Sequence, residues 1–126
     1  VLKHVSQQDQ VSAFTKAMGQ AFDQKPTRES AQLRQKLIME EAGEVFEELD
    51  RDVINKVALT KELADLLYVV HGTAVAFGLP LEPAFVRVHE SNMSKFGDDG
   101  KPIYREDGKV LKGPNYHKPD LTDLFK

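Results

Sequence analysis

The chain has 126 residues, of which 40% are hydrophobic and 29% charged, a composition typical of one ordinary globular domain. It has no cysteine, which excludes disulfides, thiolate zinc sites and a cysteine nucleophile and favours a reducing, cytoplasmic location. The net charge is −3 and no apolar run approaches the ~20 residues of a membrane span, so we expect neither a nucleic-acid partner nor a membrane.

The first predicted helix runs over about residues 7–22. Residues 1–4 before it lead into no apolar stretch, so we expect no signal peptide. Ser6 is the predicted N-cap, with Asp9 as its capping-box partner. Apolar side chains recur at helical spacing and predict one core-facing stripe: Val11, Phe14, Met18 and Phe22.

The second predicted helix runs over about residues 28–51 and is capped by Thr27 or Ser30. Its core-facing stripe consists of Ile38, Ala42, Val45 and Leu49. The third predicted helix runs over about residues 52–77, and its centre is apolar almost all round, as in a buried helix. Gly78 is expected to end it as a C′ glycine.

The fourth predicted helix runs over about residues 82–96, and glycine and proline become frequent after it. Asp107-Gly108 lies between Ile103-Tyr104 and Val110-Leu111, which predicts a hairpin with a two-residue turn. We therefore expect an all-α fold: a helical bundle of about four main helices with a short C-terminal ribbon or extended arm. It forms one domain over residues 1–126, with a helical core over about 6–96 and the hairpin and arm over about 97–126, and it oligomerises through helix faces.

Two groups of acidic residues carry the chemistry of the sequence. Glu40, Glu41 and Glu44 lie on the second predicted helix, and Glu62 and Asp65 lie on the third. Residues three or four apart share a helix face, and a short connection makes the two helices antiparallel neighbours. Four or five carboxylates should therefore face one another. Such a cluster repels itself unless a cation neutralises it, which predicts a site for Mg²⁺, or Mn²⁺ in its place.

The acidic residues allow other interpretations. Glutamate runs are common on solvated helix faces, but Asp65 lies in the most apolar part of the chain, where an unpaired charge is costly. A di-iron carboxylate bundle needs Glu-x-x-His pairs, and none of the four histidines has a glutamate three residues before it. A non-catalytic helical interaction protein with a solvated or partner-binding acidic face stays open.

The spacing of these acids resembles a known pattern. Glu40-Glu41-x-x-Glu44, followed after 17 residues by Glu62-x-x-Asp65, resembles the EExxE…ExxD pattern of the all-α NTP pyrophosphatases. These include the MazG-like proteins, dimeric dUTPases, dCTP pyrophosphatases and phosphoribosyl-ATP pyrophosphohydrolases. The segment 65–74 and Asn92-x-x-Lys95 also look like MazG-type sequences, so the resemblance covers about residues 30–96.

The resemblance implies a Mg²⁺-dependent hydrolase that cleaves a (d)NTP to a (d)NMP and pyrophosphate by a metal-activated water. It implies metal ligands at Glu41, Glu44, Glu62 and Asp65, with Glu40 as a further ligand or as the residue that positions the attacking water. It also implies a homodimer or homotetramer. Phosphoribosyl-ATP pyrophosphohydrolysis in histidine synthesis would use the same carboxylates and stays open as the second enzymatic reading.

Several residues are candidates for substrate binding, and the resemblance implies a phosphate or sugar contact for Asn92 and Lys95. Some relatives carry a lysine where this chain has Val88, so lysines of the tail are candidates for phosphate contact instead. Two roles are open for Lys36, a phosphate contact or an ion pair, and two for Tyr68, base stacking or core packing. The full set is Lys36, Tyr68, Asn92, Lys95, Lys109 and Lys112.

Overall fold

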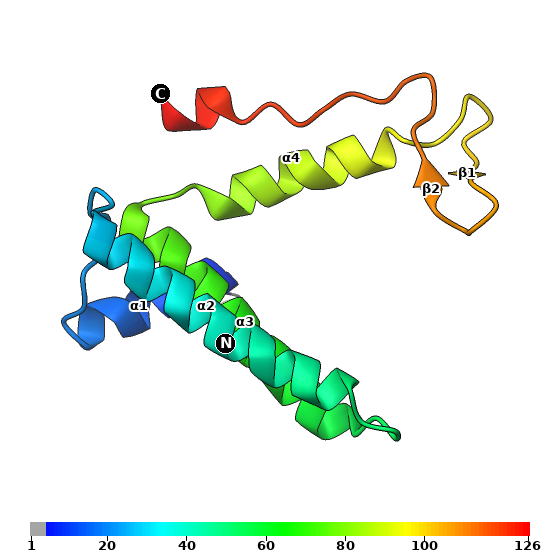
Figure 1. Cartoon of the computed structure of the whole chain (residues 1–126). Helices are drawn as coiled ribbons and strands as arrows, with labels where there is room; N and C mark the ends of the chain where they lie inside the picture. The colour runs from blue at the N-terminus through cyan, green and yellow to red at the C-terminus, as the bar shows by residue number, and fades with distance from the viewer. Residues whose placement is uncertain (1–4) are drawn as a thin grey trace. The chain divides into compact units, whose positions relative to one another are not determined.

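The computed structural model describes residues 5–126, so the prediction about the first four residues lies outside the described part. Its elements are α1 (Gln7–Ala17), α2 (Arg28–Leu49), α3 (Lys56–Phe77), α4 (Leu81–Met93), β1 (Ile103–Tyr104), β2 (Val110–Leu111) and a 3-10 turn, η1 (Thr122–Phe125) (Figure 1). The all-α prediction with a short ribbon and an arm is confirmed. The chain divides into two compact units at Leu79/Pro80, and each is described by itself.

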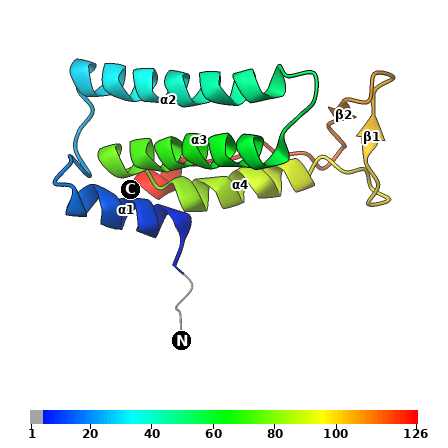
Figure 2. The ribbon, with the colours of Figure 1, turned by 90° about the horizontal axis from the view of Figure 1, so that it is seen from below.

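In the first unit, α3 lies between α1 and α2 and contacts both (Figures 1 and 2). α2 and α3 run antiparallel, because only the residues 50–55 connect them. Thr27 caps α2 through a capping box with Ser30, and the Asn55 side chain caps α3 by accepting from the Ala58 amide at 3.1 Å. Each cap satisfies backbone N–H groups that have no partner within the helix, which fixes where the two long helices begin.

The predicted helices are present with different ends. α1 stops at Ala17 instead of about residue 22, because Gly19 adopts a φ of +68° and turns the chain out of the helix. α3 begins at Lys56 instead of about residue 52, because Asn55 caps it in an extended conformation. Gly78 ends α3 with a φ of +66°, as predicted, and this left-handed conformation favours glycine.

The core of the first unit is small. The buried hydrophobic residues of the described chain are Val11, Val45, Ala74 and Val75. The prediction that the centre of α3 is buried all round is wrong for the single chain, because Leu63 and Leu67 stay 47% and 42% exposed. The predicted stripes are also only partly buried: Phe14, Met18, Phe22 and Leu49 are exposed.

The second unit contains α4, the ribbon and the arm. β1 and β2 pair antiparallel, with Ile103 opposite Leu111. The turn is not the predicted two-residue Asp107-Gly108 turn: the Gly108 amide donates to the Arg105 carbonyl at 2.9 Å, so Glu106 and Asp107 are its central residues. The Asp107 carboxylate holds this position, since it accepts from the Lys109 amide and from the Arg105 guanidinium.

The arm after the ribbon is attached to α4 by polar contacts. The Arg87 guanidinium donates to both carboxylate oxygens of Asp123 at 2.6 and 2.8 Å, and Ser91 donates to the His117 carbonyl at 2.8 Å. Among the described residues no single helix is long and apolar enough to cross a membrane, although α3 and α4 taken together as a bent pair meet that test by length and composition alone.

Candidate metal centre

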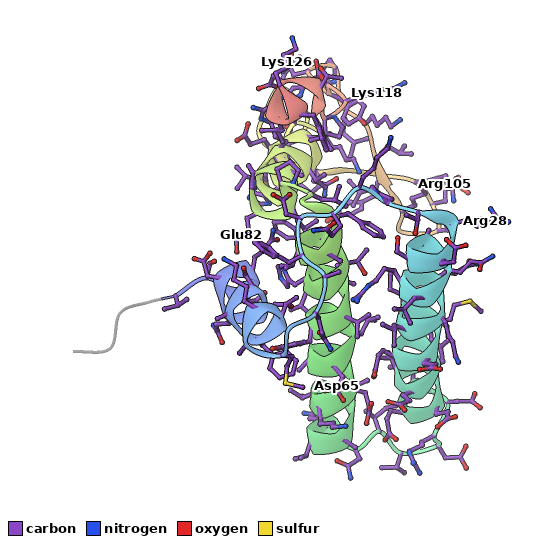
Figure 3. All side chains as sticks on the ribbon, turned by 90° about the vertical axis from the view of Figure 1, so that its left-hand side faces the viewer. Arg28, Asp65, Glu82, Arg105, Lys118 and Lys126 are labelled. Atoms are coloured by element: carbon purple, nitrogen blue, oxygen red, sulfur yellow. The ribbon has the colours of Figure 1, made fainter. Side chains whose placement is uncertain are left out.

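Four of the five predicted carboxylates meet in the first unit. Glu41 and Glu44 on α2 and Glu62 and Asp65 on α3 each offer one oxygen, and these four oxygens lie within 4.8 Å of one another. The helical spacing brings each pair onto one face, and the antiparallel pairing brings the faces together. Figure 3 shows Asp65 on α3, in the half of the helix nearer the connection to α2.

Two oxygens of this cluster are buried without a hydrogen-bond partner among the described residues: Oε2 of Glu41 and Oε2 of Glu62. A buried carboxylate oxygen without a donor is costly, because desolvation is not compensated. A bound cation would compensate this cost, and the four acids could hold one. Hard carboxylate oxygens in this number fit a divalent cation such as Mg²⁺ or Mn²⁺.

Lys61 supplies part of the missing positive charge. Its ammonium lies 2.6 Å from Oδ2 of Asp65 and 3.6 Å from Oε1 of Glu62. The pKa of Glu62 is nevertheless raised, first by a hydrogen bond shared with the Glu44 carboxyl, then by desolvation and by repulsion from Glu44 and Asp65, with Lys61 acting in the opposite direction. One lysine therefore does not balance the four acids. The Lys61 side chain is 65% exposed, so water also solvates its ammonium.

The same residues fall inside a family match. The model of the phosphoribosyl-ATP pyrophosphohydrolase family matches residues 11–92, more than half of the 126 residues, and this segment includes all of α2, α3 and the four acids. The chain belongs to the phosphoribosyl-ATP pyrophosphohydrolase family. It is therefore a member of a family of pyrophosphohydrolases, and the resemblance seen in the EExxE…ExxD pattern is confirmed.

Solved structures and curated proteins provide two further comparisons. Among solved structures, the crystal structure of a candidate NTP pyrophosphohydrolase from Exiguobacterium sp. 255-15, at 1.78 Å resolution, is 26% identical to the chain. The match covers 91% of this chain and 75% of that one, with a TM-score of 0.48. No curated protein matches the chain.

Glu40, the fifth predicted acid, lies outside the group of four in this family member. It is exposed and lines a groove of about 410 Å³ on α2, together with Lys36, Met39 and two glutamines. Lys36 makes no ion pair among the described residues, so of its two open roles the salt bridge is not observed. Contact of Lys36 with phosphate stays a prediction, as does the role of Glu40 in positioning water.

Of the remaining substrate-binding candidates, one belongs to the first unit and four belong to the second. Tyr68 belongs to the first unit, is 42% exposed and meets Phe14 edge to face with ring centroids 5.9 Å apart. Asn92, Lys95, Lys109 and Lys112 belong to the second unit. The Lys112 ammonium lies over the Tyr116 ring at 4.8 Å, and the Lys95 carbonyl accepts from the Gly113 amide at 2.7 Å. Substrate contact by these four residues stays a prediction.

A cleft of about 630 Å³ lies along the same helices, and none of the four acids lines it. Leu37, one turn before Glu41, and Tyr68, one turn after Asp65 in the same helix, line it with Phe14 of α1. Phe14 and Tyr68 therefore pack on each other at the border of an open space, and base stacking by Tyr68 stays a prediction. Arg34 also lines the cleft, and no sequence pattern marks it, because an isolated arginine on a helix has no characteristic spacing.

Proposed function

We propose that the chain is a Mg²⁺-dependent nucleoside-triphosphate pyrophosphohydrolase, which converts a (d)NTP and water into a (d)NMP and pyrophosphate. One observation carries the proposal: Glu41, Glu44, Glu62 and Asp65 gather within 4.8 Å, and two of their oxygens are buried without a partner among the described residues. A family of pyrophosphohydrolases is the context in which such a cluster has a chemical use.

The four carboxylates would hold the cation, and Mn²⁺ would fit the same oxygen ligands. When bound, a divalent cation supplies positive charge to the phosphate oxygens and acidity to water. The protein contributes two rigid helices that hold the acids in place before substrate arrives. Such preorganised charge is usually the largest single contribution to catalysis of this type.

Glu40 is proposed as the residue that positions the attacking water. It is exposed, lies directly before Glu41 on α2 and is not part of the group of four, so its carboxylate is free to accept a proton. Lys36, one turn before it, is proposed to contact a phosphate, because an exposed ammonium on this side of α2 has no ion pair among the described residues. In the reaction, oxygen from water joins phosphorus, the bond between the α- and β-phosphates breaks, and pyrophosphate leaves.

A second candidate substrate is phosphoribosyl-ATP, since the matching family model carries that name. The same four carboxylates would serve either substrate, so the metal centre does not separate them. A substrate panel does: purified protein with Mg²⁺ is offered each (d)NTP and phosphoribosyl-ATP, and pyrophosphate release is measured. We expect release from at least one (d)NTP at a rate above that from phosphoribosyl-ATP. A preference for phosphoribosyl-ATP would instead assign the second activity.

The panel needs a variant that shows whether pyrophosphate release comes from this site or from a contaminating enzyme. Asp65→Asn removes one charge of the cluster with little change in shape, and we expect it to abolish pyrophosphate release. Glu47→Gln is the matched control, because Glu47 lies exposed on α2 outside the cluster. Normal turnover by Asp65→Asn would refute the assignment of the site, and no release from any nucleotide by the unmodified chain would support a non-catalytic interaction protein.

We also propose that the chain works as a homodimer or homotetramer in the cytoplasm. No side chain among the described residues has less than 2% of its surface exposed. Three apolar side chains of α3 are exposed: Val57, Leu63 and Leu67. An exposed apolar face of this kind is typical of an interface, and a second copy would bury it symmetrically. Sedimentation equilibrium tests this: we expect twice or four times the chain mass of 14.2 kDa.

A further inference from the structure

Arg34 of α2 is a half-buried cation without an acidic partner. Its Nε donates to Oγ1 of Thr73 at 3.1 Å, and its Nη2 donates to the carbonyl of Val69 at 3.1 Å. Within residues 5–126 it forms no ion pair, and partial burial lowers the pKa of its guanidinium. A guanidinium has more N–H donors than these two contacts use, so donors on Nη1 stay available to a ligand.

Gly72 makes room for this arrangement. A Cβ at residue 72 would lie 2.7 Å from Nη2 of Arg34 and 3.7 Å from its Cζ. The guanidinium therefore rests against the backbone of α3, and any larger residue at 72 would displace it. Because the crowded atom is the far end of a flexible side chain, the displacement would not require the helices to move. Two acceptors thus hold Arg34 in one position, and the missing side chain of Gly72 leaves room for it there.

This position lies in line with the acidic cluster. Arg34 precedes Glu41 by seven residues and Gly72 follows Asp65 by seven, so Arg34 and Gly72 lie on the same helix faces as the acids, roughly 10 Å along the helices. Leu37 and Tyr68 lie within this interval and, with Arg34 and Gly72, line the cleft of about 630 Å³. Its lining contains Lys25, amides and hydroxyls but no Asp or Glu. Along α2 and α3 the side chains are therefore acidic at the cluster, apolar around Leu37 and Tyr68, and cationic at Arg34.

We infer that this cleft holds the nucleobase of the substrate and that Arg34 selects 6-oxopurines, whose O6 and N7 accept from a guanidinium side by side. The inference rests on the proposed function, which places the phosphates at the acidic cluster. A base reaching from there enters the apolar part of the cleft and presents its edge to Arg34. Guanine and hypoxanthine offer two adjacent acceptors, whereas adenine offers N7 next to an amino donor that meets the guanidinium unfavourably.

Two variants test Arg34. Arg34→Met removes the donors, and Gly72→Ala leaves the arginine in the chain but displaces its guanidinium. The matched substrates are ITP and ATP, which differ at the 6-position, with 7-deaza-GTP as a probe of the N7 contact. Binding of IMP and AMP is measured in EDTA by calorimetry, so that one readout needs neither metal nor turnover. Pyrophosphate release is measured with Mg²⁺ in parallel.

We expect the unmodified chain to prefer ITP over ATP by at least tenfold in kcat/KM and IMP over AMP in binding. Both variants should reduce these ratios to near one, chiefly by loss of the oxo substrate. A wild-type preference for ATP, or an oxo-to-amino ratio that survives in Arg34→Met, would overturn the inference. So would a selective loss of activity toward phosphoribosyl-ATP in the variants, because Arg34 would then be a ligand of the phosphate on its phosphoribosyl group. If no nucleotide releases pyrophosphate but the chain still binds IMP better than AMP, the proposed function is wrong and the base cleft is supported.

Discussion

Removing one charge from the acidic cluster should abolish much of the stabilisation by Mg²⁺ without harming the fold. Glu41→Gln is the sharpest change, because Oε2 of Glu41 is one of the two buried oxygens without a partner among the described residues. In EDTA the variant should melt at the wild-type temperature or slightly above it, since a neutral amide replaces an uncompensated charge. With Mg²⁺ the two proteins should differ.

The expected size follows from ligand linkage and chain length. At a free Mg²⁺ concentration of 100 times Kd, binding stabilises the native state by about 2.7 kcal/mol. With an unfolding entropy of roughly 2.1 cal/mol/K per residue, this raises the melting temperature of a chain of 126 residues by about 10 °C. Each tenfold loss of affinity removes about 1.4 kcal/mol, or about 5 °C. Glu41→Gln should lose at least that much.

The assay is differential scanning calorimetry in EDTA and across a Mg²⁺ titration. Glu47→Gln serves as the control, since it removes the same charge from the exposed part of α2 and should keep the full Mg²⁺ response. An equal Mg²⁺ shift in Glu41→Gln and the unmodified chain would refute the reasoning, because the ion would then bind elsewhere or act only by screening.

Three smaller predictions concern the fold around the site. Thr27→Ala should lower the free energy of unfolding by about 1 kcal/mol in urea titrations, because it breaks the capping box with Ser30 that begins α2. Gly78→Ala should cost at least ~1 kcal/mol in the same assay, since its φ of +66° is unfavourable for alanine. The contact of the arm with α4 should weaken in acid: Arg87 holds the pKa of Asp123 below its ordinary value of 3.8, so the contact is present above that value and is lost as pH falls through the lowered pKa. Protection factors, which are amide exchange rates corrected for their intrinsic pH dependence, should fall over residues 120–126 below about pH 3.8 and stay constant between pH 5 and 7. Protection factors that are flat down to pH 2 would contradict this assignment.

Much of the secondary structure was predictable because it depends on local chemistry. Apolar periodicity located the four helices, and Thr27 and Gly78 marked ends that the structure confirms. The ends of α1 and α3 were displaced because Gly19 and Asn55 act through backbone conformation and capping, which compete with periodicity over the same few residues. The hairpin turn was displaced by one residue for a similar reason, since the Asp107 side chain fixes it through its neighbours.

The acidic cluster was predictable because two helical spacings and one short connection determine it. Glu40 was not separable from its neighbours in this way: adjacent residues on a helix point about 100° apart, and only the structure shows which of them faces α3. Arg34 was invisible in the sequence because its importance depends on the missing side chain of Gly72 on another helix. Burial was overpredicted for α3, because apolar periodicity does not reveal whether a covering surface belongs to the same chain.

Metal-dependent cleavage between the α- and β-phosphates can be followed by ³¹P NMR of dGTP incubated with the purified chain, with Mg²⁺ and with EDTA. With Mg²⁺ we expect equal growth of the dGMP and pyrophosphate signals, and with EDTA we expect no change. Release of inorganic phosphate with dGDP would contradict cleavage between the α- and β-phosphates. Reaction at an unchanged rate in EDTA would contradict a metal centre built from the four carboxylates.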